Sequence, residues 1–146
     1  MDDIIKIIEK KLRYTDWKIR MYGRAILREV YMSKPQFQAL QIINDMEGEA
    51  TCSTLTDIMQ LAPSTISTIT KKLESEGYIE KNISDDDKRS IKLVIKDDGK
   101  DLIDDVIKRR CDFINDALKE LDYEDAQNIA KYLSILHDAI TKDRLD

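Results

Sequence analysis

The hydrophobic periodicity of the chain changes near residue 79 from the repeat of a helix to the repeat of a strand. Upstream, PSTISTITKKLESEG at residues 63–77 places Ile66, Ile69 and Leu73 three and four positions apart, which is the spacing of one helix face. Downstream, YIEKNI and IKLVIK alternate apolar and polar residues as strands do. The segment SDDDKRS between these two runs is therefore expected to form the loop of a β-hairpin.

Four helices are expected before the hairpin and two after it. Through residues 1–30, apolar side chains recur three and four positions apart, which predicts one long amphipathic helix. Ser33 and Pro35 favour the start of a second helix, and Gly48 favours its end. A short helix over TCSTLTDIMQ then precedes residues 63–77, and two amphipathic patterns follow the hairpin. The fold is therefore predicted to be mainly α-helical with one small β-hairpin.

Composition fits one helix-rich globular domain spanning residues 1–146. The chain contains 36% charged residues, with 4 Gly and 2 Pro. Its N-terminus, MDDIIKIIEKK, is acidic with spaced apolar residues, so it does not resemble a signal peptide, and no apolar run approaches a membrane span. Two distant cysteines, Cys52 and Cys111, indicate free thiols in a reducing compartment. These features predict a cytoplasmic protein.

The net charge of −5 is unevenly distributed. Residues 1–59 carry 9 bases and 9 acids, and residues 60–96 carry 7 bases and 6 acids. Residues 97–146 carry 8 bases and 14 acids. Because the acidity belongs to the last third of the chain, the middle of the chain remains free to approach phosphate groups.

Two short helices followed by a hairpin are the pattern of a winged helix-turn-helix, expected over residues 33–96. In that arrangement the second short helix enters the major groove of DNA. If Ile66, Ile69 and Leu73 face inward, small hydroxyl and basic side chains face outward, and no acid follows until Glu74. Hydroxyl groups and lysines suit base edges and phosphates. The recognition-helix residues expected at DNA are Pro63, Ser64, Thr65, Ser67, Thr68, Lys71 and Lys72.

Both parts of this motif also have a plainer interpretation. The outward face of the second short helix could be an ordinary solvated surface, although Ser and Thr are weak helix formers. The loop SDDDKRS could be a solvated turn, because Ser and Asp favour turns. A calcium site is excluded, since an EF-hand loop starting at Asp85 requires Gly and Glu where Ser90 and Lys96 stand.

The segments FQALQII, LTDIMQLAPSTISTITKKLESEGYIEK and DDDKRSIKLVIKDDGK resemble, in order, the MarR family of bacterial transcription regulators. The most specific part is an acid-x-arginine signature before a strand and Gly99. The resemblance implies a homodimer, formed by helices at 1–30 and 97–146, that binds a near-palindromic operator in double-stranded DNA and represses transcription. It also implies that Arg89 reaches the minor groove while Asp87 orients basic side chains. The wing residues expected at DNA are Asp87, Lys88, Arg89 and Ser90.

One departure from the family pattern affects the recognition helix. Ala62 stands where the family often carries serine or a similar N-cap. The helix at 63–77 is therefore expected to begin without a side-chain cap, an interaction that contributes about 1 kcal/mol where it exists.

The resemblance also implies a small aromatic or lipophilic effector, bound between the dimer helices and the DNA-binding lobe. Aromatic and methionine side chains at helical spacing suit such a pocket, and they suit a plain hydrophobic core equally well. The candidate pocket residues are Trp17, Met21, Tyr22 and Phe37.

Other chemistry is poorly supported by the sequence. His137 is the only histidine, so a zinc site is not expected. Cys52 near a helix start could sense oxidants, whereas Cys111, between Ile107 and Ile114, is expected to be a small buried residue. No catalytic triad, phosphate-binding glycine loop or paired catalytic carboxylates occurs, so no enzyme activity and no cofactor are predicted.

The alternative to a DNA-binding regulator is a protein-interaction module whose acidic final third docks a basic partner.

Overall fold

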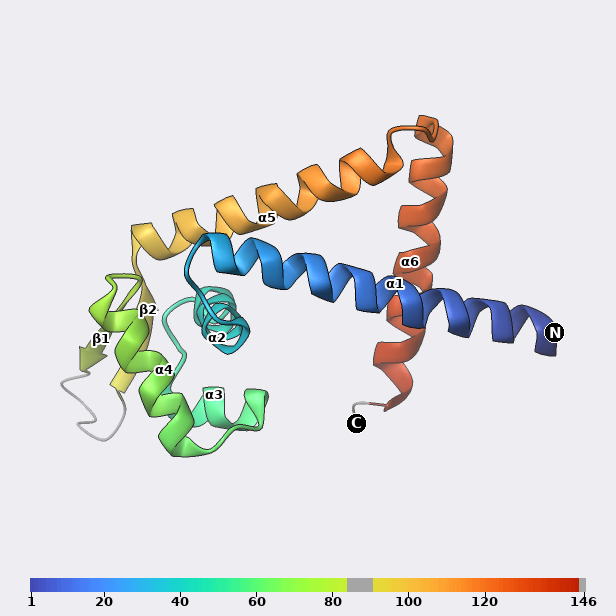
Figure 1. The fold of residues 1–146 in the computed structure, drawn as a ribbon. Coiled ribbons are helices and arrows are strands. Elements are labelled where there is room, and N and C mark those ends of the chain that lie inside the picture. The colour runs from blue at the N-terminus through green and yellow to red at the C-terminus, as the bar shows by residue number, and fades with distance from the viewer. Residues whose placement is uncertain (84–90, 145–146) are drawn as a thin grey trace. The chain divides into compact units, whose positions relative to one another are not determined.

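The computed structural model describes residues 1–83 and 91–144 (Figure 1). It confirms the mainly helical fold with one two-stranded hairpin. The chain divides into two compact units, Met1–Arg110 and Cys111–Asp146, and each is described separately. The elements are α1 (Asp2–Glu29), α2 (Lys34–Asp45), α3 (Cys52–Met59), α4 (Pro63–Ser75), β1 (Ile79–Ile83), β2 (Ile91–Ile95), α5 (Asp97–Leu118) and α6 (Tyr123–Arg144).

Reciprocal capping boxes start the second and third helices. At α2, the Gln36 backbone N–H donates to Ser33 Oγ at 3.3 Å, and the Ser33 N–H donates to Gln36 Oε1 at 3.0 Å. At α3, Thr51 and Thr54 form the same pair of bonds at 3.1 and 2.8 Å. Each box satisfies backbone donors that a helix start leaves unpaired. The predicted cap at Ser33 is therefore confirmed.

The hydrophobic core of the first unit lies among α2, α3, α4 and the hairpin, together with the end of α1 and the first half of α5. Its members are apolar residues spaced by helical or strand periodicity, so each element turns one face inward. The largest fully buried side chains are Leu40, Ile43, Leu55, Ile66, Leu73, Ile79, Leu93, Val106 and Thr70. This core fixes the two short helices and the base of the hairpin as one body.

The hairpin is antiparallel, and its register pairs Ile79 with Ile95 and Ile83 with Ile91. A third segment joins it, because Ala50 forms an isolated bridge with Leu93, whose N–H donates to the Ala50 carbonyl at 2.7 Å. Ile79 and Leu93 are buried, whereas Ile83 and Ile91, next to the loop, are 63% and 40% exposed. The hairpin is therefore anchored at Ile79 and at the centre of β2, and its loop end is exposed.

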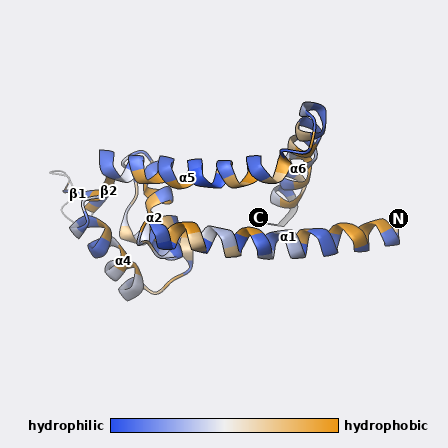
Figure 2. Cartoon of the chain, turned by 45° about the horizontal axis from the view of Figure 1, so that its top comes forward, coloured by the Kyte–Doolittle hydropathy of each residue, from blue (hydrophilic) through white to orange (hydrophobic). Residues whose placement is uncertain are grey.

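The long helix α1 has only two buried residues, Ile26 and Leu27, near its C-terminal end. Most of the remaining apolar residues, which recur along the helix in Figure 2, are exposed, whereas Ile19 and Ala25 are half-buried. No helix in the described part of the chain combines the length and the apolar composition needed to span a membrane.

The start of α5 lies close to Tyr78 and Ile95 at Gly99, and Ile103 and Val106 further along the helix are buried. Further along, Arg109 donates to Glu29 Oε2 at 2.5 Å and to Asp105 Oδ2 at 3.1 Å. Asp105 is the main cause of a raised pKa for Arg109, and Glu29 also raises it. These bonds connect the end of α1 to α5 within the first unit.

The second unit contains the end of α5 and all of α6. Asp122 caps α6, because its carboxylate accepts a hydrogen bond from the Asp125 N–H at 2.8 Å. None of the described α6 residues is buried. The expectation that Cys111 is buried is wrong, since its side chain is exposed: helical spacing identifies an apolar face but not whether anything covers it.

Candidate nucleic-acid interface

The position of α4 is set by its buried face. Ile66, Ile69 and Leu73 point into the core, as the sequence predicts, and Thr70 is also buried. Thr70 Oγ1 donates to the Ser67 carbonyl at 3.2 Å and lies 3.8 Å from Cys52 Sγ, at the start of α3. The helix lies beside α3 (Figure 1) and packs on it through a polar contact as well as apolar ones.

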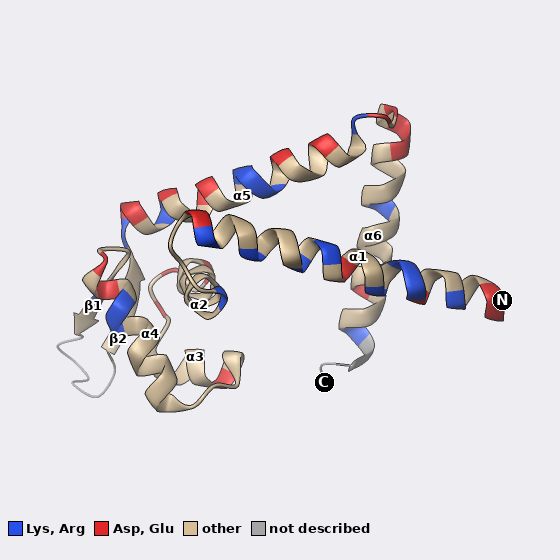
Figure 3. Ribbon diagram, in the orientation of Figure 1, with Lys and Arg blue, Asp and Glu red and all other residues tan. Residues whose placement is uncertain are grey.

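The opposite face of α4 carries hydroxyl and lysine side chains. Ser67 is half-buried, and the Thr68 hydroxyl donates to the Ser64 carbonyl at 3.0 Å, which leaves its oxygen lone pairs free to accept. Figure 3 shows the first turns of α4 without acidic or basic residues. The exposed members of the predicted recognition set are Pro63, Ser64, Thr65, Thr68, Lys71 and Lys72.

The start of α4 lacks a side-chain cap, as expected from Ala62. No acidic residue occurs in its first turn. None of the described hydrogen bonds uses the backbone N–H groups of Ser64 or Thr65. Unpaired N–H groups and the positive end of the helix dipole favour an anion such as phosphate.

The wing is tied to the rest of this lobe by charge and by backbone pairing. Lys92 Nζ lies 2.8 Å from Glu49 Oε2. The hydrogen bond from Lys92 is the main cause of a lowered pKa for Glu49. Asp87, Lys88, Arg89 and Ser90, which were predicted to contact DNA, lie outside the described residues.

The candidate effector residues do not all meet in one place. Phe37 is 5% exposed and lines a cavity of about 460 Å³ in the first unit. Trp17, Met21 and Tyr22 are exposed on α1 and do not line this cavity. Its charged lining, which sequence reasoning missed, comprises Asp16, Arg20, Arg24, Lys34 and Arg110. From the sequence alone, a charged residue on a helix is expected to face solvent. Only the packing of α1, α2 and α5 shows that these charged residues surround one cavity.

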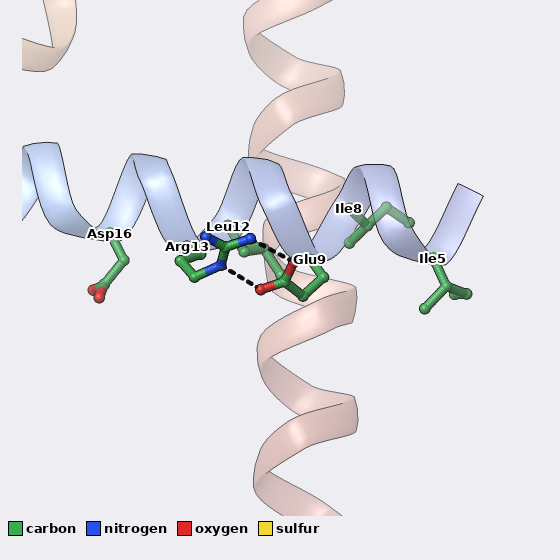
Figure 4. A pocket seen from close by; sticks show the side chains of 6 residues that line it. All are labelled: Ile5, Ile8, Glu9, Leu12, Arg13 and Asp16. Atoms are coloured by element: carbon green, nitrogen blue, oxygen red, sulfur yellow. Dashed lines mark hydrogen bonds and ion pairs between the residues drawn. The ribbon is translucent and has the colours of Figure 1, made fainter. Parts of the chain in front are cut away.

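A second hollow follows α1 near its N-terminal end. Ile5, Ile8 and Leu12 line it and are 54%, 43% and 41% exposed (Figure 4). Arg13 and Glu9 form a two-bond ion pair there, with distances of 2.6 and 3.1 Å. This pairing lowers the pKa of Glu9 and raises that of Arg13. The hollow is thus an apolar strip with a neutralised polar border.

Residues 1–83 and 91–144 contain no group of three or more His, Cys, Asp and Glu side chains placed to hold a metal ion. His137 is exposed, with Nδ1 3.4 Å from Asp138 Oδ1.

The helix pair α3–α4 and the hairpin behind it define a winged helix-turn-helix protein. The model of the MarR family matches residues 32–91. A MarR family protein from Bacillus stearothermophilus is 27% identical, with a TM-score of 0.85 over 97% of this chain and 99% of that one. The transcriptional regulator Tm0710 from Thermotoga maritima is 30% identical, with a TM-score of 0.78 over 94% and 96%. The uncharacterized HTH-type transcriptional regulator YsmB of Bacillus subtilis (strain 168) is 28% identical over 126 residues, 86% of each chain.

The chain belongs to the MarR family of winged-helix transcriptional regulators, as the sequence resemblance predicts. Members of this family are DNA-binding regulators rather than enzymes. A mutant of S. aureus MepR bound to an oligodeoxyribonucleotide has the same fold at 13% identity, with a TM-score of 0.73.

Proposed function

We propose that the protein acts in the cytoplasm as a homodimeric repressor, which binds a near-palindromic operator through α4 and the wing. The observation that carries this proposal is the outward face of α4. It presents hydroxyl groups, then Lys71 and Lys72, with no acid before Glu74. Small side chains let a helix approach base edges closely, and lysines neutralise phosphates.

The wing supports α4 in this proposal. Its second strand, β2, is fixed by the Ala50–Leu93 bridge and the Glu49–Lys92 ion pair. A strand held at its base can direct the residues at 87–90 toward the DNA backbone or minor groove. Arg89 is proposed to enter the minor groove, and Asp87 to orient the basic side chains.

A second copy of this chain is the proposed partner of the exposed apolar faces. On α1 these include Ile5, Ile8 and Leu12, and on α6 they include Leu133 and Ile140. Exposed apolar surface that recurs along a helix favours association, because its burial removes it from water. A two-fold dimer would place two copies of α4 about 34 Å apart, one turn of DNA, which explains a palindromic operator.

Dimerisation is tested by replacing the apolar strip on α1. Leu12→Glu should convert a dimer to a monomer in sedimentation equilibrium, since an unpaired carboxylate would be buried in the interface. Lys11→Glu, at the neighbouring position, should leave the dimer intact. A wild-type monomer, or a dimeric Leu12→Glu variant, would contradict the assignment.

DNA binding is tested with Thr65→Asp in the first turn of α4. The added carboxylate suits the positive end of the helix, so folding is preserved, but it repels phosphate. Against DNA flanking the protein's own gene, affinity should fall at least about tenfold. Asn128→Asp on α6, which adds the same charge, should bind like the wild type.

Equal affinities of Thr65→Asp and the wild type for this DNA would contradict the assignment of α4 to the DNA interface. Absence of sequence-specific binding by the wild type at any salt concentration would instead favour the protein-interaction module.

Regulation by a small-molecule effector completes the proposal. The cavity lined by Phe37 joins the helix assigned to dimerisation, α1, to α2 in the DNA-binding lobe. A ligand there would favour dimers with one spacing of the two α4 helices and so shift the population that fits the operator.

A further inference from the structure

The cavity beside Phe37 has a strongly basic lining. Its volume is about 460 Å³, within the range of small-molecule sites. Arg20 and Arg24 come from α1, Lys34 from the start of α2, and Arg110 from α5. All of these residues lie in the unit Met1–Arg110. Three elements therefore contribute cations to one space.

Only one of these cations is neutralised by a neighbour in the described structure. Arg20 Nε donates to Asp16 Oδ1 at 2.9 Å, and Asp16 is the only acidic residue in the lining. In residues 1–83 and 91–144, Arg24, Lys34 and Arg110 form no ion pair or side-chain hydrogen bond. The cavity consequently retains three positive charges without a partner.

The rest of the wall can hold an apolar body and a polar head. Leu27 and Phe37 are buried side chains at the cavity, and Ile19 is half-buried. Gln38 and Gln41 add amide groups that can donate hydrogen bonds. At Gly23 no atom lies within 4 Å of the position a Cβ would take, so this part of the wall is open.

We propose that this cavity binds a small organic dianion, such as a phosphate monoester with one apolar group, rather than a neutral lipophilic molecule. This inference rests on the proposed role of the cavity as the effector site. A dianion neutralises most of the charge on Arg24, Lys34 and Arg110. Each guanidinium group can also donate two parallel hydrogen bonds to phosphate oxygens. A monocarboxylate leaves two cations unpaired, and a neutral molecule leaves all three.

The placement of the cations gives the ligand a regulatory effect. Arg24 lies on α1, whereas Lys34 begins α2, which packs against α4. A dianion bound to both links the helix assigned to dimerisation to the body that carries α4. Ligand binding should therefore change the affinity of the dimer for its operator. Because coupling between two sites is reciprocal, the size of this change equals the difference in ligand affinity between the operator-bound and the operator-free dimer.

The ligand class is tested by isothermal titration of the full chain without DNA. At about pH 7.5 phenyl phosphate is largely a dianion, since the second phosphate pKa is about 6. It should bind at least about tenfold more tightly than benzoate, and phenol should show the weakest binding. Inorganic phosphate should bind less tightly than phenyl phosphate, because it lacks the apolar group. Equal affinities for phenyl phosphate and benzoate would contradict the proposed preference for a dianion. Equal affinities for inorganic phosphate and phenyl phosphate would contradict the proposed binding of an apolar group.

The site is tested with charge-removing variants. Arg24→Gln and Lys34→Gln should each weaken phenyl phosphate binding about tenfold. Lys10→Gln, which removes the same charge from α1 outside the cavity, should bind like the wild type, and thermal melts identify any variant that fails to fold. Folded cavity variants with wild-type affinity would place the ligand elsewhere. Because this titration contains no DNA, its result is independent of whether the operator proposal succeeds.

Discussion

Lys92 Nζ lies 2.8 Å from Glu49 Oε2, and this ion pair joins β2 to the segment that leads into α3. The adjacent residues, Ala50 and Leu93, form the backbone bridge of the same junction. One polar and one backbone contact therefore fix β2 of the wing to the helix-turn-helix. Glu49 and Lys92 are 43 residues apart in the sequence, and the orientation of the wing relative to α4 depends on the contact between them.

The Glu49–Lys92 pair should make stability depend on pH. The Lys92 hydrogen bond lowers the folded-state pKa of Glu49, so its contribution is present above the unfolded pKa and is lost as pH falls through the folded pKa. Near neutral pH, Glu49→Gln should melt slightly below the wild type, because the pair is solvent-exposed. The difference should vanish in acid. Melting curves between about pH 7 and pH 3 measure it, with Glu80→Gln as the control. A difference that persists in acid would contradict the linkage.

Two glycine-to-alanine substitutions should have opposite effects. At Gly99 a Cβ would lie 2.5 Å from the Tyr78 carbonyl oxygen and 2.8 Å from Ile95 Cγ1, so Gly99→Ala should cost about 1–3 kcal/mol of unfolding free energy. At Gly23 nothing lies within 4 Å, so Gly23→Ala should gain about 1 kcal/mol from helix propensity. Urea unfolding compares them. Equal effects at the two sites would refute the assigned packing around Gly99.

The helix caps offer a matched pair of tests. Ser33→Ala removes a capping box and should destabilise the protein by about 1 kcal/mol. Ala62 has the extended backbone of an N-cap, with φ −61° and ψ 145°, but no capping side chain. Ala62→Ser should therefore stabilise by up to about 1 kcal/mol. Urea denaturation measures both; a Ser33→Ala protein as stable as the wild type would show that the box contributes nothing.

Lys71 is exposed on the outward face of α4. If it contacts a phosphate, Lys71→Ala should reduce the log–log slope of operator affinity against salt by about one unit, because one fewer counterion is released. Lys10→Ala on α1 should leave the slope unchanged. The measurement is fluorescence anisotropy over a series of salt concentrations, and an unaltered slope for Lys71→Ala would argue against a phosphate contact.

The sequence by itself determined the order and type of the elements. Periodicity at Ile66, Ile69 and Leu73 defined the buried face of α4, and the alternation after residue 79 defined the hairpin. Ser33 marked the start of α2 correctly. These features are local, since a helix face or a cap depends on residues within one or two turns.

Only the tertiary structure decided which apolar faces are covered and which distant charges meet. Ile26 is buried while Ile5 is exposed, although both belong to one periodic stripe of α1. Arg24, Lys34 and Arg110 surround one cavity although they come from three helices. Burial and charge grouping depend on what packs against an element, and periodicity within that element contains no information about its neighbours.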